Sequence, residues 1–184
     1  SHRNGTWPAR RYGPSSAWRA RRHTGAVGSA QTLGITGGNV TLRASCLCQG
    51  VALEIEGQVR DMLFCHCSMC RKVHGSAFRA RARVKTADLR WVRGEKLVKY
   101  FESSPGEHRG FCSVCGSNII TTFQATPHEI GLALGILDDD PGNRPVCHVF
   151  VGSRAPWYEI TDQLPQYEEF PPGHTPPHSA KGDA

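Results

Sequence analysis

The sequence predicts a mainly β domain of antiparallel strands with one short helical turn, stabilised by bound zinc. Three observations predict this class: short segments that alternate apolar and polar residues, turn-forming residues between those segments, and cysteines grouped in tight clusters. Alternation with a period of two is typical of strands, and no segment shows the apolar period of a long helix. At 184 residues the chain is long enough to bury one core.

The expected strands follow from this alternation. Val51, Leu53 and Ile55 share one face of the segment 51–57. The segment 78–85 alternates without a break, and its four apolar residues are expected to face inward. Its four cations are expected to form a solvated sheet face, with an anion site as the alternative: Arg79, Arg81, Arg83 and Lys85. Further strands are expected at 89–94, 96–102, 118–124, 129–137 and 146–152.

The only short helix is expected at 67–74, with Ser68 as its N-cap and Gly75 as its stop.

Charge and composition divide the chain into three parts. Residues 1–39 carry six arginines and no acid, and are expected to be a disordered basic tail. One alternative for this part is a mitochondrial targeting segment, although its prolines and glycines interrupt the amphipathic helix that such a segment forms. Another is a segment added for expression. Residues 40–170 are expected to form the zinc domain, and residues 171–184 a disordered Pro-rich tail.

The net charge of +6 lies entirely in the first part. Residues 40–184 hold sixteen Lys and Arg against sixteen Asp and Glu, so nucleic acid is not an expected partner of the domain. No stretch approaches the ~18 consecutive apolar residues of a membrane helix, and no apolar region follows the arginines as in a secretory signal. We therefore expect a cytoplasmic protein without a membrane partner.

The grouping of the cysteines favours metal over disulfides. Seven of the eight fall into C-x-C at 46–48, C-x-C-x-x-C at 65–70 and C-x-x-C at 112–115. Cysteines this close make poor disulfides with one another but can share an ion. The two outer pairs together supply four thiolates for a closed, structural zinc site: Cys46, Cys48, Cys112 and Cys115.

The central triplet, Cys65, Cys67 and Cys70, has no evident fourth cysteine. Cys147 lies in an apolar run and is expected to be a small buried residue. His66 is expected to face away from its neighbours, whereas three other histidines remain candidate ligands: His74, His108 and His148. The remaining alternative is an open position, which is typical of catalytic zinc.

A site of three thiolates suits a substrate thiol better than a hydrolytic water. Three thiolates around a dication leave a net charge near −1, so the ion is a weaker Lewis acid than one held by neutral histidines. Zinc lowers the pKa of a thiol and presents the thiolate to an electrophile. Arg71 and Lys72 follow the triplet, and either neutralise its charge, hold the carboxylates of a thiol substrate, or are surface cations.

Four motifs together resemble the glutathione-dependent formaldehyde-activating enzyme family, also called the centromere-protein-V domain family. They are "SCLCQG", "CHCSMCRKVHGSAF", "HRGFCSVCGS" and the segment 135–170 with "APW" and "LPQ". The resemblance covers about residues 41–170 and implies an Mss-four-like fold. It also implies one structural zinc on the outer pairs and a second zinc on the triplet. The implied activity is condensation of formaldehyde with glutathione to S-(hydroxymethyl)glutathione, a carbon–sulfur lyase reaction.

The leading hypothesis is therefore a zinc-dependent enzyme that acts on a small glutathione-like thiol and an aldehyde, with the triplet as its catalytic residues. One alternative is a non-catalytic, zinc-stabilised binding module that uses the basic tail. Another is redox or metal buffering by the triplet. The residues do not specify the particular thiol, the aldehyde or the oligomeric state.

Overall fold

The computed structural model describes residues 41–173. The expected basic tail at 1–39 and most of the expected tail at 171–184 lie outside the described residues. Within the described part, no helix is both long enough and apolar enough to cross a membrane.

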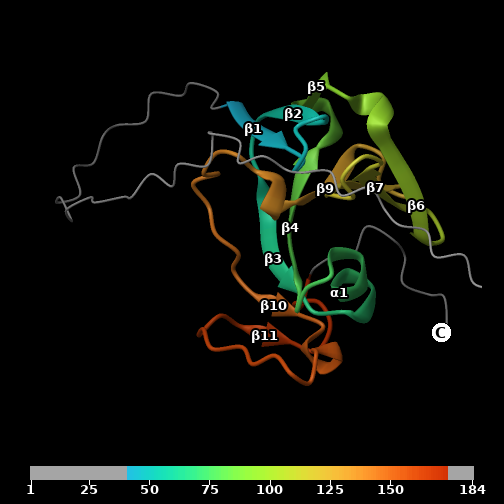
Figure 1. The fold of residues 1–184 in the computed structure, drawn as a ribbon. Helices are drawn as coiled ribbons and strands as arrows, with labels where there is room; N and C mark the ends of the chain where they lie inside the picture. The colour runs from blue at the N-terminus through green and yellow to red at the C-terminus, as the bar shows by residue number, and fades with distance from the viewer. Residues whose placement is uncertain (1–40, 174–184) are drawn as a thin grey trace, which may run out of the picture. The chain divides into compact units, whose positions relative to one another are not determined.

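The described chain is mainly β, as predicted, with two sheets and one short α-helix (Figure 1). The smaller sheet has the strand order β1 (Thr41–Ser45), β2 (Ala52–Glu56) and β5 (Leu89–Arg93). The larger sheet has the order β11 (Gln166–Tyr167), β10 (His148–Val149), β3 (Arg60–Cys65), β4 (Arg79–Lys85), β9 (Glu129–Ala133), β8 (Asn118–Phe123), β7 (Glu107–Cys112) and β6 (Val98–Ser104). The helix α1 spans Ser68–His74 and packs against β4.

Most strand pairs are antiparallel, but β10 runs parallel to both β3 and β11. This arrangement brings the late segment of the chain back beside Cys65, which lies opposite Val149 in the pairing of β3 with β10. In Figure 1, β10, β11 and α1 accordingly gather at the same end of β3 and β4. The site of Cys65, Cys67 and Cys70 therefore lies where segments distant in sequence meet.

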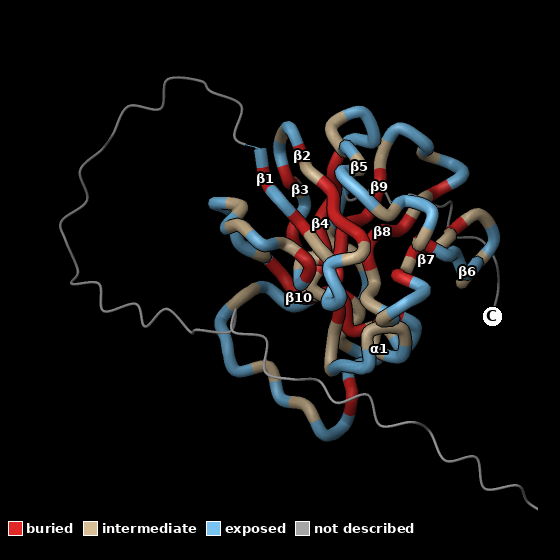
Figure 2. Tube along the Cα trace, turned by 45° about the horizontal axis from the view of Figure 1, so that its top comes forward, coloured by how far each residue is buried: buried red, intermediate tan, exposed pale blue. Residues whose placement is uncertain are grey.

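The core lies between the strands that the alternation predicts. Leu53 and Ile55 of β2 pack in one cluster with Val84 of β4, Ile119 of β8 and Leu132 of β9, and all five side chains are fully buried. Figure 2 shows buried residues concentrated on the inner strands, whereas the edge strand β6 is largely exposed. The strand β4 lies between β3 and β9 in the larger sheet. Its side chains are buried on both faces, except for the half-buried Ala80 and the exposed Lys85.

Two expected strands are shorter in the structure. The segment 129–137 leaves the sheet after Ala133 and forms a 3-10 turn over Leu134–Ile136. The segment 146–152 pairs only at β10, because Phe150 adopts a positive φ of 58° and turns the chain away from the sheet.

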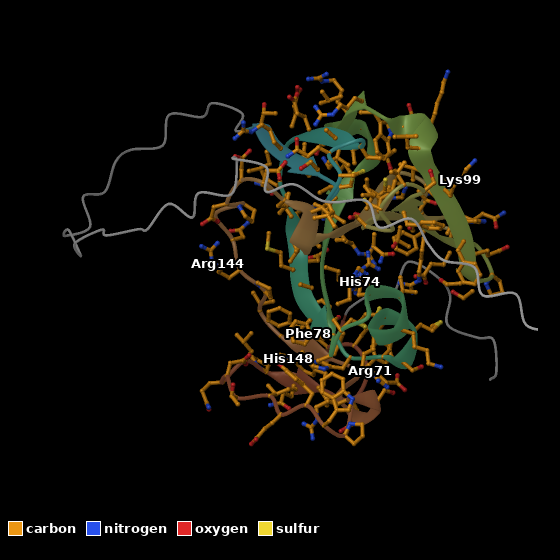
Figure 3. All side chains as sticks on the ribbon, in the orientation of Figure 1. Arg71, His74, Phe78, Lys99, Arg144 and His148 are labelled. Carbon is orange, nitrogen blue, oxygen red and sulfur yellow. The ribbon has the colours of Figure 1, made fainter. Side chains whose placement is uncertain are left out.

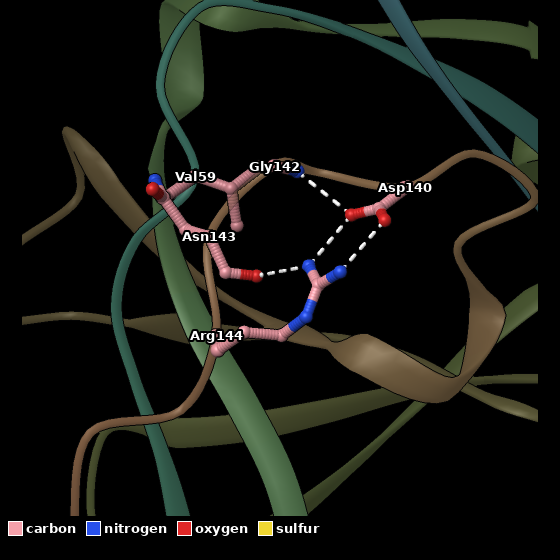
Figure 4. Close-up of polar contacts among 5 residues, drawn as sticks. All are labelled: Val59, Asp140, Gly142, Asn143 and Arg144. Atoms are coloured by element: carbon pink, nitrogen blue, oxygen red, sulfur yellow. Dashed lines mark hydrogen bonds and ion pairs between the residues drawn. The ribbon is translucent and has the colours of Figure 1, made fainter. Parts of the chain in front are cut away.

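The loop before β10 is held by its own polar contacts (Figure 4). Asp140 accepts a hydrogen bond from Gly142 N at 2.9 Å and is paired with both terminal nitrogens of Arg144 at 2.7 and 2.8 Å. Gly142 has a φ of 76°, a conformation that favours glycine. Asn143 Nδ2 donates to Val59 O at 3.4 Å. These contacts fix the loop against the chain that leads into β3 and so direct β10 toward Cys65.

Candidate metal centre and active site

Four cysteine sulfurs from two distant turns lie together. The Sγ atoms of Cys46, Cys48, Cys112 and Cys115, here called the four-cysteine set, all lie within 4.8 Å of one another. Neighbouring sulfurs are 3.5 Å apart for Cys46 and Cys48 and 3.8 Å apart for Cys48 and Cys112. Sulfurs at about 2.3 Å from one tetrahedral zinc would be about 3.8 Å apart. All eight cysteines, each within the described residues, are free thiols. The set can therefore hold a metal ion.

The three-cysteine set lies where β3 leads into α1. The Sγ atoms of Cys65, Cys67 and Cys70 lie within 4.8 Å of one another. The expectation that Ser68 caps α1 is wrong: Cys67 is the N-cap, and its sulfur accepts a hydrogen bond from Cys70 N at 3.4 Å. The cap orients the Cys67 sulfur toward its two partners, and Gly75 ends the helix in a left-handed conformation as predicted.

No further His, Cys, Asp or Glu from the part of the chain that the structure describes joins the three-cysteine set. Cys147 is 5% exposed and packs in the neighbouring apolar cluster with Leu63 and Val149, as predicted for a small buried residue. The histidines that the sequence left as candidate ligands are likewise not members of the group. The two sets are therefore unequal, with four protein sulfurs in one and three in the other.

His66 faces away from the three-cysteine set, as its position between two of the cysteines predicts. Its Nε2 lies 2.8 Å from Nδ1 of His148, and Nε2 of His148 lies 3.0 Å from a carboxylate oxygen of Asp162. His66 is fully buried, and burial lowers its pKa to about 4, so that it is neutral at pH 7. This chain of hydrogen bonds ties the backbone between Cys65 and Cys67 to the late segment of the protein.

The cations of β4 are buried, which contradicts the expectation of a solvated face. Arg79, Arg81 and Arg83 are only 4%, 7% and 4% exposed, and Lys85 alone is exposed. Alternation does place the three arginines on one face of β4. The helix α1 packs against β4 and helps to cover this face. In the neighbouring strand β3, Cys65 lies directly opposite Arg79. The polar face of this strand is therefore part of the interior.

Two buried arginines are paired with carboxylates. Arg83 lies 2.5 Å from Glu129, which also binds Arg60 at 2.7 Å. Arg109 of β7 lies 2.7 Å from Glu107 on the same strand. Charges in an interior are stable only when they are paired or hydrogen-bonded, so these contacts hold β4, β9 and β7 in place.

We expect Glu129→Gln to destabilise the protein by about 2–3 kcal/mol at pH 7, because Arg83 would lose its carboxylate inside the protein. The ion pairs with Arg60 and Arg83 lower the pKa of Glu129 below its ordinary value of 4.5. A lowered pKa contributes stability that is complete above the ordinary value and is lost as the pH falls through the lowered one. Urea unfolding at stepwise lower pH should therefore show the gap between wild type and variant closing below pH 4.5. A gap independent of pH would contradict this assignment.

Three buried arginines influence the three-cysteine set, one by contact and two through their charge. Arg109 Nη1 lies 3.9 Å from Cys70 Sγ. Hydrogen bonds from Cys65 and Cys67 lower the pKa of the Cys70 thiol, and the charges of Arg79 and Arg109 lower it further. Arg81 also interacts electrostatically with the sulfurs of this set. These charges therefore favour the thiolate form of Cys70, whereas hydrogen bonds to the other two thiols raise the pKa of Cys65.

Arg79, Arg81 and Arg109 were not predicted to belong to the site. The alternating cations of 78–85 were a visible signal for the first two, but the pattern does not reveal what covers them. Arg109 had no signal beyond its place three residues before Cys112.

The two cations that follow the triplet have different positions. Arg71 Nε donates to His66 O at 3.2 Å, near His148 and Phe78 at the β10 end of the sheet (Figure 3). Lys72 lines a cavity of about 660 Å³, and His74, which also lines it, lies nearer the middle of the sheet. The cavity wall consists of Lys72, Val73, His74, Gly75, Ser76, Phe78, Arg79, Ala80, Cys115, Gly116, Ser117, Asn118, Ala133, Gly135 and Ile136. The cavity therefore lies between α1, which carries Cys70, and the turn that carries Cys115.

Residues 41–153 match the model of the family described as glutathione-dependent formaldehyde-activating enzyme. The chain belongs to this family. The matched segment contains both cysteine sets, the buried arginines of β4, and Arg109. The formaldehyde-activating family thus provides the context in which the geometry of the site can be interpreted.

Among solved structures, the chain is similar to a Rhodobacter sphaeroides protein whose crystal structure was determined as a Northeast Structural Genomics target. The two chains are 30% identical, the match covers 56% of this chain and 97% of the other, and the TM-score is 0.45. No curated protein matches the chain.

Proposed function

We propose that the protein is a zinc-dependent carbon–sulfur lyase that joins a small thiol to an aldehyde, as S-(hydroxymethyl)glutathione synthase joins glutathione to formaldehyde. The observation that carries this proposal is the inequality of the two cysteine sets. Membership of the formaldehyde-activating family supports a glutathione-like thiol and an aldehyde as substrates.

The donor sets fit zinc. Thiolates are soft ligands that zinc accepts in tetrahedral sites, and the sulfur separations in the four-cysteine set agree with that geometry. We assign one structural zinc to the four-cysteine set and a second zinc to Cys65, Cys67 and Cys70. Zinc at the second site would lower the pKa of a substrate thiol and hold the thiolate. Such thiolate sites require a reducing compartment, so we propose a cytoplasmic location.

The chain's own residues would favour the reaction in two ways. Zinc held by Cys65, Cys67 and Cys70 would have no fourth protein ligand among the described residues, which would leave a position for the substrate sulfur. The guanidinium groups of Arg79, Arg81 and Arg109 offset the negative charge of the thiolates and make the approach of another anion less costly. The sequence alone predicts a net charge near −1 for this site, because it does not reveal that these arginines are buried beside the cysteines.

The reaction itself is an addition. The lone pair of the substrate thiolate forms the carbon–sulfur bond at the aldehyde carbon, and the carbonyl π electrons move to oxygen. That oxygen takes up one proton, which balances the proton lost by the thiol. The reverse reaction breaks the same bond and releases the aldehyde.

Exchange NMR with ¹³C-formaldehyde and glutathione tests this function. We expect the zinc-loaded protein to raise the rate of exchange between free formaldehyde and the adduct above the uncatalysed rate, without shifting the equilibrium. Replacing glutathione with other small thiols then identifies the preferred substrate. An exchange rate that is unchanged for every thiol and aldehyde pair would contradict the proposed activity.

A further inference from the structure

Arg79 is a buried cation whose hydrogen-bonding groups are not all used. Its side chain is 4% exposed, and its Nε is buried without a hydrogen-bond partner. The ion pairs found among the described residues include none to Arg79. Burial lowers the pKa of Arg79 and the charge of the nearby Cys70 offsets that effect only in part, so a bound anion would reduce the remaining desolvation cost.

The other buried arginines differ from Arg79 in their contacts. Arg83 and Arg109 are paired with Glu129 and Glu107. The Arg81 guanidinium lies 5.7 Å from the centre of the Phe170 ring and does not line the cavity. Of these four arginines, Arg79 alone combines the absence of a carboxylate partner with a position in the cavity wall.

Arg79 connects the cavity to the proposed reaction site, whose three cysteines do not themselves line the cavity wall. Arg79 lies opposite Cys65 in the antiparallel pair of β3 with β4, and directly opposed residues project from the same face. The charge of Arg79 also acts on Cys70. A ligand that contacts Arg79 in the cavity would therefore be adjacent to the three-cysteine set.

The rest of the cavity wall suits an anion of peptide-like character. The wall contains two cations, Lys72 and Arg79, and no Asp or Glu. The wall also contains the polar side chains of Ser76, Ser117 and Asn118, and its apolar side chains are Val73, Phe78, Ala80, Ala133 and Ile136. Ser76 Oγ already donates to Phe78 O, and Ser117 Oγ accepts from Leu47 N. Asn118 Nδ2 is already hydrogen-bonded to Val73 O at 2.9 Å, which fixes the orientation of the amide. A volume of about 660 Å³ lies within the usual range for small-molecule pockets.

We infer that Arg79 binds a carboxylate of the substrate thiol in this cavity, while the thiol sulfur extends to the three-cysteine set. The inference rests on the proposed function for the identity of the ligand as a thiol. Its new content is the residue that recognises the substrate carboxylate. It also replaces Arg71 with Arg79 as the cation that recognises the substrate, because Arg71 is engaged with His66 O at the β10 end.

Calorimetric titration of the zinc-loaded full chain with S-methylglutathione tests this inference. The methyl group blocks the sulfur, so the probe reports the contacts of the remaining molecule. We expect the diacid to bind, and its diethyl ester, which has no carboxylate, to bind at least about tenfold more weakly, because the ester loses the charge-assisted hydrogen bonds to the guanidinium. Equal affinity for the two forms, or no binding of the diacid, would overturn the inference without any need for a variant.

Two variants test whether Arg79 is the residue that binds the carboxylate. Arg79→Met should weaken binding of the diacid at least about tenfold and leave the weaker binding of the ester nearly unchanged. Arg71→Met is the control, since Arg71 also lies near the three-cysteine set but is outside the cavity wall and is bonded to His66 O, and it should retain most of the affinity for the diacid. A larger loss in Arg71→Met than in Arg79→Met would contradict the assignment.

The two proposals fail separately. If the protein catalyses exchange but binds the diacid and the ester equally, the carboxylate site is refuted and the lyase activity is supported. If it binds the diacid selectively but catalyses no exchange, the lyase activity is refuted and the anion site is supported.

Discussion

The variant Cys112→Ala is expected to be largely unfolded. Cys112 is fully buried and contributes one of the four sulfurs that join the β1–β2 turn to the β7–β8 turn. Binding of a structural zinc contributes on the order of 10 kcal/mol to folding, which is comparable to the entire stability of a typical domain. Removing one ligand should therefore abolish the cooperative unfolding transition measured by circular dichroism in urea.

Cys147→Ala is the matched control for this variant. Cys147 is also a buried cysteine, at 5% exposure, but it belongs to neither set. Its loss removes only a small buried group, with an expected cost of about 1 kcal/mol. Similar destabilisation in the two variants would show that Cys112 acts through packing rather than through a metal ion.

The variant Cys67→Ala is expected to remain folded and to lose the activity. Cys67 is partly exposed, and the three-cysteine set lies at the end of β3 rather than between the two sheets. The expected rate of aldehyde exchange in this variant equals the uncatalysed rate. The folded state should lose only about 1 kcal/mol, the usual contribution of a helix N-cap, because the Cys67 sulfur caps α1.

Cys67→Ser separates the cap from the proposed ligand. A serine hydroxyl can accept the hydrogen bond from Cys70 N and so restore the cap, but it is a poor replacement for a thiolate ligand. We therefore expect this variant to have nearly wild-type stability and no catalysed exchange. Full activity in either variant would contradict the role assigned to the three-cysteine set.

Local spacing was sufficient to predict which cysteines gather. C-x-C on an extended segment and C-x-x-C in a turn each place two sulfurs on one side, whatever the rest of the fold does. Pairing of the two outer motifs across 64 residues depended in addition on the assumption that each has only the other as a complement. The structure brings these sulfurs together, and the binding of zinc to them stays a prediction.

Burial of the arginines could not be predicted in the same way. Alternation indicates which residues share a face of β4, but it does not indicate whether solvent or another element covers that face. Cations that alternate with apolar residues along a strand usually face solvent. The strands β1, β3, β7 and β11 were not predicted either. In β7 the reason is related, because Glu107 and Arg109 are buried there as an ion pair and obscure the apolar alternation. In both cases the interior contains charges that only tertiary contacts explain.

The zinc content of the wild-type chain and of Cys67→Ala, measured beside their thermal unfolding, tests the central claim most directly. That claim is that the two cysteine sets hold separate ions with different roles. We predict two zinc ions per wild-type chain, and one per chain in a Cys67→Ala variant that still unfolds cooperatively. Loss of both ions together with the fold, or no loss of zinc at all, would contradict it.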